Sequence, residues 1–280
     1  MMPNFVNSAR MCLAVTTVAL AASAIPAVAQ SATAEDLLEA MDVKTVVQIM
    51  QTEGYDYADS LAADMLPGGA TEAWKQTVKR IYDADRMEAT VKAEFLVEFA
   101  DHDVAPLMAF FVDGPGAQFI ALENSARRAM MDEGVEEAAR EVYKTQAANP
   151  DARYDLMEDF VQANGLIDAN VEGAMNAAYQ FYRGLANGGA LDSGEDDIIA
   201  DVYETEPETR VDTREWVYGF LLMAYRPMSD ADLQAYVDLS NTDAGRALNR
   251  ALFAGFDRMY GDISYALGLA IARAMQTQEL

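Results

Sequence analysis

Two short glycine-containing breaks decide the fold that the sequence predicts. The first is "FFVDGPGAQF", residues 110–119, and the second is "LSNTDAGRAL", residues 239–248. Gly116 and Gly245 occupy the same place in the two stretches. A glycine in the first turn of a helix has no Cβ and lets another backbone approach closely. We therefore interpret each stretch as a tight corner between two helices, and the repetition as a sign that the chain contains two copies of one unit.

Each glycine follows a polar residue at a distance of three positions. These residues, Asp113 and Thr242, are predicted N-caps, since their side chains can accept hydrogen bonds from the free N–H groups of a helix start. An anion site at such a helix start is the functional alternative. Pro115 removes one N–H donor there, and the acidic chain opposes any anion, so we favour the packing role.

The segments between the breaks have the apolar period of α-helices. Apolar residues recur three and four positions apart, as in Trp74, Val78 and Ile81, while sustained alternation of apolar and polar residues is absent. Further helix starts are predicted at Thr33, Asn149, Ser193, Asp212 and Ser229. The fold class expected from these patterns is all-α, a helical bundle built from two pseudo-repeated helical units.

The duplication is supported by matches that occur in the same order along the chain. They pair "QIMQTEG" (48–54) with "DFVQANG" (159–165), "LPGG" (66–69) with "LANGG" (185–189), "VKRIYDAD" (78–85) with "IADVYETE" (199–206), and "VKAEFLV" (91–97) with "WVYGFLL" (216–222). Shared amphipathic periodicity alone is the alternative explanation. We predict helical repeat 1 over residues 30–148 and helical repeat 2 over residues 149–280, packed as one merged domain.

The N-terminus has the three parts of a secretory signal peptide. Arg10 precedes an apolar run from Met11 to about Ile25, and "AVA" (27–29) supplies the small residues of a cleavage site. An uncleaved anchor is disfavoured because the run falls short of the roughly 20 residues that span a membrane. We predict a signal peptide over residues 1–29 and a periplasmic or secreted protein. Cleavage removes Cys12, the single cysteine, and with it any disulfide, thiol nucleophile or thiolate metal site.

The strong acidity of the chain limits its partners. There are 46 acidic and 20 basic residues, for a formal net charge of −26. Such a charge repels nucleic acid and anionic lipid headgroups, which bind cationic patches. We expect an unknown protein, a peptide or an apolar small molecule as partner, and no transmembrane segment in the mature chain.

The sequence contains no constellation that indicates a cofactor, a metal site or catalytic residues. The single histidine, His102, lies near Glu98 and Asp101, but a metal site needs further ligands, so a surface histidine near a helix end is favoured. The acidic stretch "SGEDD" (193–197) lacks the ligand spacing of a calcium loop. Serine-nucleophile and glycine-rich phosphate motifs are also absent.

The first corner resembles that of an exported bacterial family catalogued as domain of unknown function 2059. The pattern of that family is an aromatic pair, a break and a glycine that opens a helix. The matching residues are Phe110, Phe111 and Gly116, and, less closely in the second copy, Leu239, Thr242 and Gly245. The chain departs from the pattern at Asp113, at Gly114 and at Pro115, which comes one place late. The resemblance implies a helical fold and export, and it implies no activity.

Two functional hypotheses from different classes follow. The first is an exported non-catalytic binding or interaction protein with an apolar groove between the two copies. The second is a hydrolase or lyase that uses carboxylates alone. Carboxylates from different helices that converge in a buried cleft with raised pKa values would favour the second.

Overall fold

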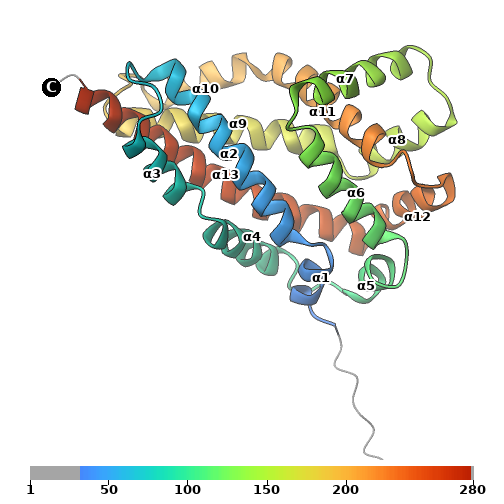
Figure 1. Cartoon of the computed structure of the whole chain (residues 1–280). Coiled ribbons are helices and arrows are strands. Elements are labelled where there is room, and N and C mark those ends of the chain that lie inside the picture. The colour runs from blue at the N-terminus through green and yellow to red at the C-terminus, as the bar shows by residue number, and fades with distance from the viewer. Residues whose placement is uncertain (1–31, 279–280) are drawn as a thin grey trace, which may run out of the picture. The chain divides into compact units, whose positions relative to one another are not determined.

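The computed structural model describes residues 32–278, which form thirteen α-helices and no β-strand (Figure 1). The all-α fold class is thereby confirmed. The predicted signal peptide, with Cys12 and the cleavage position after Ala29, lies outside the described residues. The helices are α1 (Ala34–Ala40), α2 (Val43–Met65), α3 (Glu72–Ile81), α4 (Ala84–Glu98), α5 (Ala105–Phe111), α6 (Gly116–Ala129), α7 (Glu133–Ala148), α8 (Ala152–Ala163), α9 (Leu166–Asn187), α10 (Glu195–Glu204), α11 (Glu206–Ala224), α12 (Asp230–Ser240) and α13 (Asp243–Gln278).

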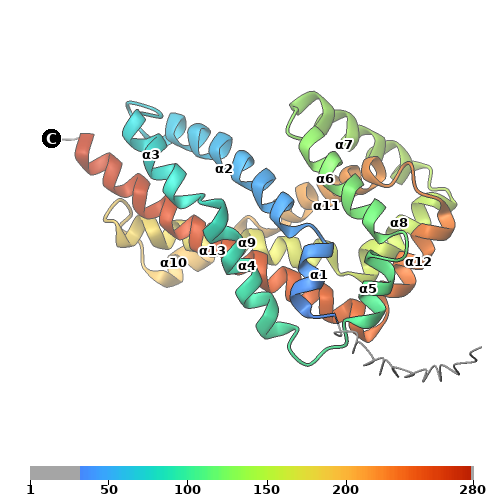
Figure 2. The ribbon, with the colours of Figure 1, turned by 60° about the horizontal axis from the view of Figure 1, so that its bottom comes forward.

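The long helix α13 runs beside α9, and the two helices are in backbone contact (Figures 1 and 2). Gly184 of α9 meets Gly268 of α13 so closely that a Cβ on Gly268 would lie 3.0 Å from the Cα of Gly184. Further along, Gly188 meets Ala272, so residue numbers rise together on both helices and the pair is parallel. Any side chain at either glycine would push the helices apart, and close packing along this line therefore requires glycine.

The apolar core consists of two clusters, and each cluster joins helices from both halves of the chain. The first combines α1 to α5 with the inner face of α13, through residues such as Ala251 and Met259. The second combines α8, the start of α9, α11 and α12 with α6, through Phe119 and Ala126. Each half thus completes its core with a helix of the other half, α13 in the first cluster and α6 in the second, and residues 32–280 form one compact unit.

The halves also run through helices of similar length in the same order. In this order α2 has 23 residues and α9 has 22, and α3 and α10 have 10 each. The residues with positive φ are Asp42 and Gly165, which precede α2 and α9, and Gly69 and Gly189, which follow them. The duplication would require these correspondences, and it stays a prediction. The match of 48–54 with 159–165 does not fit this order, because the first lies inside α2 and the second crosses the end of α8.

Both predicted corners bring a glycine against the preceding helix, as the sequence indicated. A Cβ on Gly116 would lie 2.6 Å from the Cα of Phe111, at the end of α5. A Cβ on Gly245 would lie 2.8 Å from the carbonyl carbon of Leu239, near the end of α12. Both distances are shorter than folded chains tolerate, so the close-approach prediction is confirmed at both positions.

The predicted N-caps hold at one corner and fail at the other. Thr242 accepts a hydrogen bond from the N–H of Gly245 at 3.0 Å. Asp113 does not cap α6, because Pro115 occupies the N-cap position with φ −75° and its carbonyl accepts from Phe119. The fixed φ of proline already suits the helix start, so the turn needs no side-chain acceptor at Asp113.

Among the other predicted helix starts, two are correct and three are wrong. Thr33 and Ser229 cap α1 and α12 with their side chains. Asn149 is replaced as cap by Asp151, and Ser193 by Gly194. Asp212 lies within α11, which begins at Glu206 and has a proline in its first turn. The missing N–H of a proline costs no helical hydrogen bond at that position.

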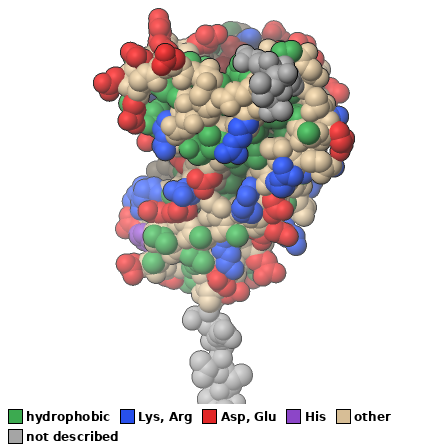
Figure 3. All heavy atoms as spheres, turned by 90° about the vertical axis from the view of Figure 1, so that its left-hand side faces the viewer, with side chains coloured by type: hydrophobic (Ala, Val, Ile, Leu, Met, Phe, Trp, Pro, Cys, Tyr) green, Lys and Arg blue, Asp and Glu red, His purple; other side chains and the backbone are tan. Residues whose placement is uncertain are grey.

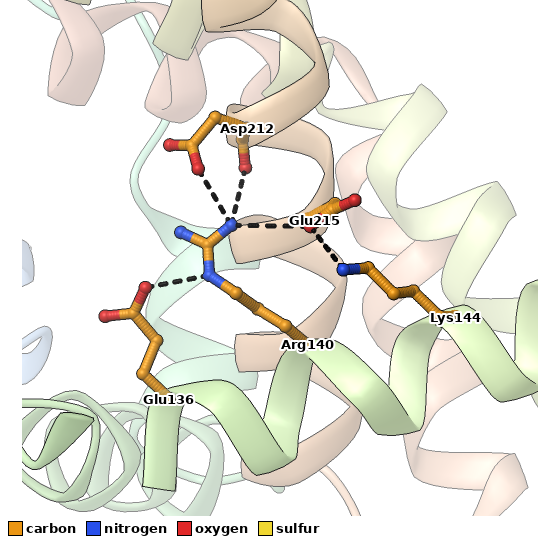
Figure 4. A network of polar contacts seen from close by, with 5 residues as sticks. All are labelled: Glu136, Arg140, Lys144, Asp212 and Glu215. Carbon is orange, nitrogen blue, oxygen red and sulfur yellow. Dashed lines mark hydrogen bonds and ion pairs between the residues drawn. The ribbon is translucent and has the colours of Figure 1, made fainter. Parts of the chain in front are cut away.

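Helix α7 packs on α11 through Ala139 and through Tyr143, which stacks on Tyr218 with ring centres 5.0 Å apart, and a polar network adds to this contact (Figure 4). Ala139 is its one buried residue, and it lies against Gly219 of α11. Beside this contact Arg140 donates to Glu136 at 2.8 Å and to Asp212 at 2.9 Å, and Lys144 pairs with Glu215 at 3.1 Å. Because the charges form a connected group, they contribute more than isolated surface pairs would.

Replacing either corner glycine by valine should destabilise the protein. Gly116→Val and Gly245→Val each place a branched side chain where a backbone lies, and we expect a loss of about 1–3 kcal/mol in the free energy of unfolding, measured in urea. Gly134→Val is the control, because the nearest heavy atom to a Cβ there is the end of the Asp132 side chain, and it should change stability by less than about 0.5 kcal/mol. Equal stability of the corner variants and the control would contradict the close packing.

Neither half of the chain should fold alone. A fragment of residues 30–148 lacks α13, and a fragment of 149–280 lacks α6, so each exposes part of a core cluster. We expect each fragment to show no cooperative thermal transition by circular dichroism, and the two together to recover one. A cooperative transition in an isolated half would show that the shared cores are dispensable.

Candidate functional site

A cavity of about 530 Å³ lies where the two halves meet, and we call it the central cavity. Helices α2 and α6 of the first half and α9 and α13 of the second half form its walls, with Trp216 of α11. A cavity of this size, lined largely by apolar side chains with a few polar groups, is typical of small-molecule sites.

The walls from α6 and α13 differ in chemistry at equivalent positions. When the corners at Gly116 and Gly245 are placed in register, Glu123, Asn124 and Arg127 correspond to Leu252, Phe253 and Phe256. All six line the central cavity. At these three positions α6 is therefore polar and α13 is apolar and aromatic, while Met41, Val43, Val46, Met50 and Ile120 add apolar groups from the first half and Asp257 adds a carboxyl group from α13.

Glu123 is a partly buried carboxyl group in the wall of the central cavity. The hydroxyl of Tyr225 donates to it at 2.6 Å, and Tyr225 itself is buried. Burial raises the pKa of Glu123 to about 7, although the hydrogen bond from Tyr225 acts in the opposite direction. Glu123 in turn helps to raise the pKa of Tyr236, after the larger effect of burial. Near neutral pH this side chain can be either protonated or ionised.

Arg127 and Asn124 are already bound by acidic partners from the first half. Arg127 donates to both oxygens of Glu53 at 2.8 Å and lies 6.0 Å from the ring centre of Trp216. Such a two-bond pair fixes the guanidinium and neutralises its charge. The buried Asn124 donates to Asp42 at 3.2 Å.

Asp257 is the second carboxyl group of the cavity that burial disturbs. Its pKa is raised to about 6, first by burial and then by the negative charge of Glu172. The carboxylate lies over Gly173 of α9, where a Cβ would come within 2.5 Å of Oδ1. Glycine at this position leaves room for the acid beside the cavity.

Two more open clefts lie away from the central cavity. One, of about 660 Å³, is lined by α3 and the end of α13, with the side chains of Arg80, Arg86 and Arg273. Figure 3 shows the face where α3 and the end of α13 lie, with acidic side chains around it and basic ones across its middle. The other cleft, of about 840 Å³, lies between α9, α10 and α11. We favour the central cavity because buried ionisable groups from both halves meet there.

The residues that the sequence singled out do not line the central cavity. Phe110, Phe111, Asp113, Gly116, Leu239, Thr242 and Gly245 belong to the two corners. The aromatic pair of the first corner instead packs on α12, where the ring centre of Tyr236 lies 5.0 Å from that of Phe110 and 5.9 Å from that of Phe111. Phe110 and Phe111 thereby join α5 to α12 of the other half. His102, the single histidine, is exposed beyond the end of α4.

Sequence reasoning missed Glu123, Arg127 and Asp257, although a signal was present. Ile120 begins an i, i+3, i+4, i+7 series that continues with Glu123, Asn124 and Arg127, so polar residues occupy the apolar positions of α6. The second half has apolar residues in the same register. Comparing the two halves position by position, with the corner glycines in register, would have marked α6.

The chain matches no protein-family profile, no curated protein and no solved structure. The resemblance to domain of unknown function 2059 therefore stays a prediction without support from these comparisons. Within residues 32–278, no single helix is both long and apolar enough to span a membrane; α5 and α6 taken together meet that length and composition, with a 65° bend between them. In the same part of the chain no three His, Cys, Asp or Glu side chains are grouped to hold a metal ion.

The ionisation of Glu123 should make stability fall as pH rises. Its pKa in the fold is about 7 against a usual 4.5, so the folded state keeps a proton that the unfolded state loses, and its contribution is lost between about pH 4.5 and 7. The groups around it are Tyr225, Tyr236, Arg127 and, across the cavity, Asp257. We expect Glu123→Gln to reduce the pH dependence between pH 5 and 8 by on the order of 2 kcal/mol, measured in urea. A matched Glu141→Gln variant, exposed on α7 and outside the cavity lining, should keep the larger share of it; an unchanged profile in Glu123→Gln would contradict the burial of this acid.

Proposed function

We propose that the exported chain is a non-catalytic binding protein, made of two copies of a helical unit, whose ligand occupies the central cavity. The observation that carries this proposal is that equivalent positions of the two halves line one cavity, polar on one wall and apolar on the other. A duplicated unit that packs face to face forms such a site between its copies, and the ligand then contacts both.

The polar groups of the cavity favour binding over catalysis. Arg127, Asn124 and Glu123 each have a partner within the protein, which holds their positions but leaves none of them as an activated nucleophile. No serine, threonine, lysine or histidine occurs among the lining residues of the described chain. Export agrees with the expected signal peptide over residues 1–29 and with the acidic, cysteine-poor composition.

A carboxylate-dependent hydrolase or lyase remains the second candidate. Glu123 and Asp257 come from different helices, line the same cavity, and both have raised pKa values. Two acids that titrate near neutrality are suited to general acid and base roles. Loss of a turnover activity in both Glu123→Gln and Asp257→Asn, with ligand binding retained, would favour this candidate.

A variant that fills the central cavity should lose ligand binding. Ala177 lines the cavity from α9, and Ala177→Leu adds a larger apolar side chain into the space. We expect the neutral lipid-like dye N-phenyl-1-naphthylamine to bind the wild type with a rise in fluorescence, and to bind Ala177→Leu at least about ten-fold more weakly, since each lost tenfold is about 1.4 kcal/mol.

The matched control for this experiment is Ala200→Leu. Ala200 is exposed on α10 and lines none of the three clefts described above, so this variant should bind the dye like the wild type. Equal binding by wild type, Ala177→Leu and Ala200→Leu would place the dye elsewhere and contradict a site in the central cavity.

A further inference from the structure

The central cavity has an excess of negative charge once its internal pairs are counted. Arg127 is the basic residue in its wall, and Glu53 neutralises it through two hydrogen bonds of 2.8 Å. Glu123 and Asp257 remain, and no positive charge is among the causes of their pKa shifts, which are burial and a Tyr225 hydrogen bond for Glu123 and burial and the charge of Glu172 for Asp257. Ionisation of these two acids would thus leave uncompensated negative charge in the cavity.

The opposite wall provides a surface for an apolar group. Leu252, Phe253 and Phe256 of α13 line it, and Trp216 and Tyr260 add aromatic rings to the same cavity. The faces of aromatic rings attract cations, and the effect is larger where water is excluded. The wall therefore suits either an alkyl chain or the carbon atoms around an ammonium group.

We propose that the ligand of the central cavity is an amphipathic cation, with an ammonium group directed to Glu123 and Asp257 and an apolar part on Leu252, Phe253 and Phe256. This inference rests on the proposed function, because it names the chemistry of the molecule bound there. A primary ammonium group has three N–H donors, enough for both carboxylates. In this complex the ammonium group pairs with the ionised form of both acids.

An anionic ligand is the main competitor, and the geometry disfavours it. Its acidic group would have to displace Glu53 from Arg127 and would then lie in a cavity that also holds Glu123 and Asp257. The surface adds to this discrimination, since a chain with a formal charge of −26 attracts cations and repels anions before contact. A neutral ligand would supply no positive charge to the two acids, although Glu123 would keep its hydrogen bond from Tyr225.

The test compares three ligands with the same alkyl chain. Decylammonium, decanol and decanoate, each below the concentration of micelle formation, are titrated into the full mature chain at pH 8 by calorimetry. We expect decylammonium to bind at least ten-fold more tightly than the other two. Alkylammonium groups, like lysine, stay charged up to about pH 10, so the charge of decylammonium does not change between pH 6 and pH 8. Glu123, with a pKa of about 7, ionises over this range, and the affinity for decylammonium should therefore rise.

Two isosteric variants and one control assign the preference to the cavity. Glu123→Gln and Asp257→Asn should each weaken decylammonium binding at least five-fold and leave decanol binding unchanged, and Glu123→Gln should remove most of the rise with pH. Asp262→Asn, exposed one turn beyond the cavity on α13, should behave like the wild type. Circular dichroism shows whether each variant is folded.

The outcomes separate this inference from the proposed function. If all three ligands bind equally, or decanoate binds best, and Ala177→Leu abolishes the binding, the cavity binds ligands but the cationic class is wrong. If no ligand binds, or if binding is indifferent to Ala177→Leu, both proposals fail. A preference for decylammonium that survives both acid variants would assign the preference to the acidic surface and overturn the site.

Discussion

The contact between α9 and α13 at Gly184 and Gly268 is the constraint on which the rest of the structure depends. The two helices are far apart in sequence and run parallel, so a chain of three helices, α10 to α12, must connect them. Because the backbones are in contact, the distance of α13 from α9 and its rotation about its own axis are fixed. Its other faces then reach α4 and α3 of the first half, and the first core cluster closes on it.

The shared cores follow from the position of α13, and the central cavity follows from the shared cores. Helix α6 enters the second cluster with Phe119 and Ala126 on one face, as α13 enters the first. Its next face, with Glu123 and Arg127, is left toward α13 and α9. A cavity remains there because the α6 side chains are polar and those of α13 are mostly apolar. The polar groups of α6 are held by other partners, Arg127 by Glu53 and Glu123 by Tyr225, and do not collapse onto the apolar side chains.

The sequence predicted the elements that depend on local chemistry. Helical period and glycine corners were readable at Gly116 and Gly245, because one missing Cβ decides each contact. Caps were less readable. Asp113 has the right side chain, but Pro115 removed the need for it, and Asp212 lies within a helix that a proline had already begun. In both cases a neighbouring proline determined the helix start.

The candidate site was not readable from one stretch of sequence, for a physical reason. Glu123, Asp257 and Trp216 come from three helices, and they line one cavity only when α6 packs with the second half and α13 with the first. Each residue alone is an ordinary member of an acidic or aromatic-rich helix. The distinguishing property of Glu123, its pKa near 7, arises from burial that exists only in the assembled structure.

The difference between the α6 wall and the α13 wall is itself an argument for a ligand. Burying charged or polar groups costs free energy, and apolar residues of similar volume in their place are often neutral or stabilising. At the three matched positions α13 has the apolar residues Leu252, Phe253 and Phe256. At the same positions α6 has Glu123, Asn124 and Arg127, whose polar groups are bound by Tyr225, Asp42 and Glu53. Packing alone gives no reason for six polar side chains where three apolar ones would close the cavity, whereas a ligand that must be held by its charged end does.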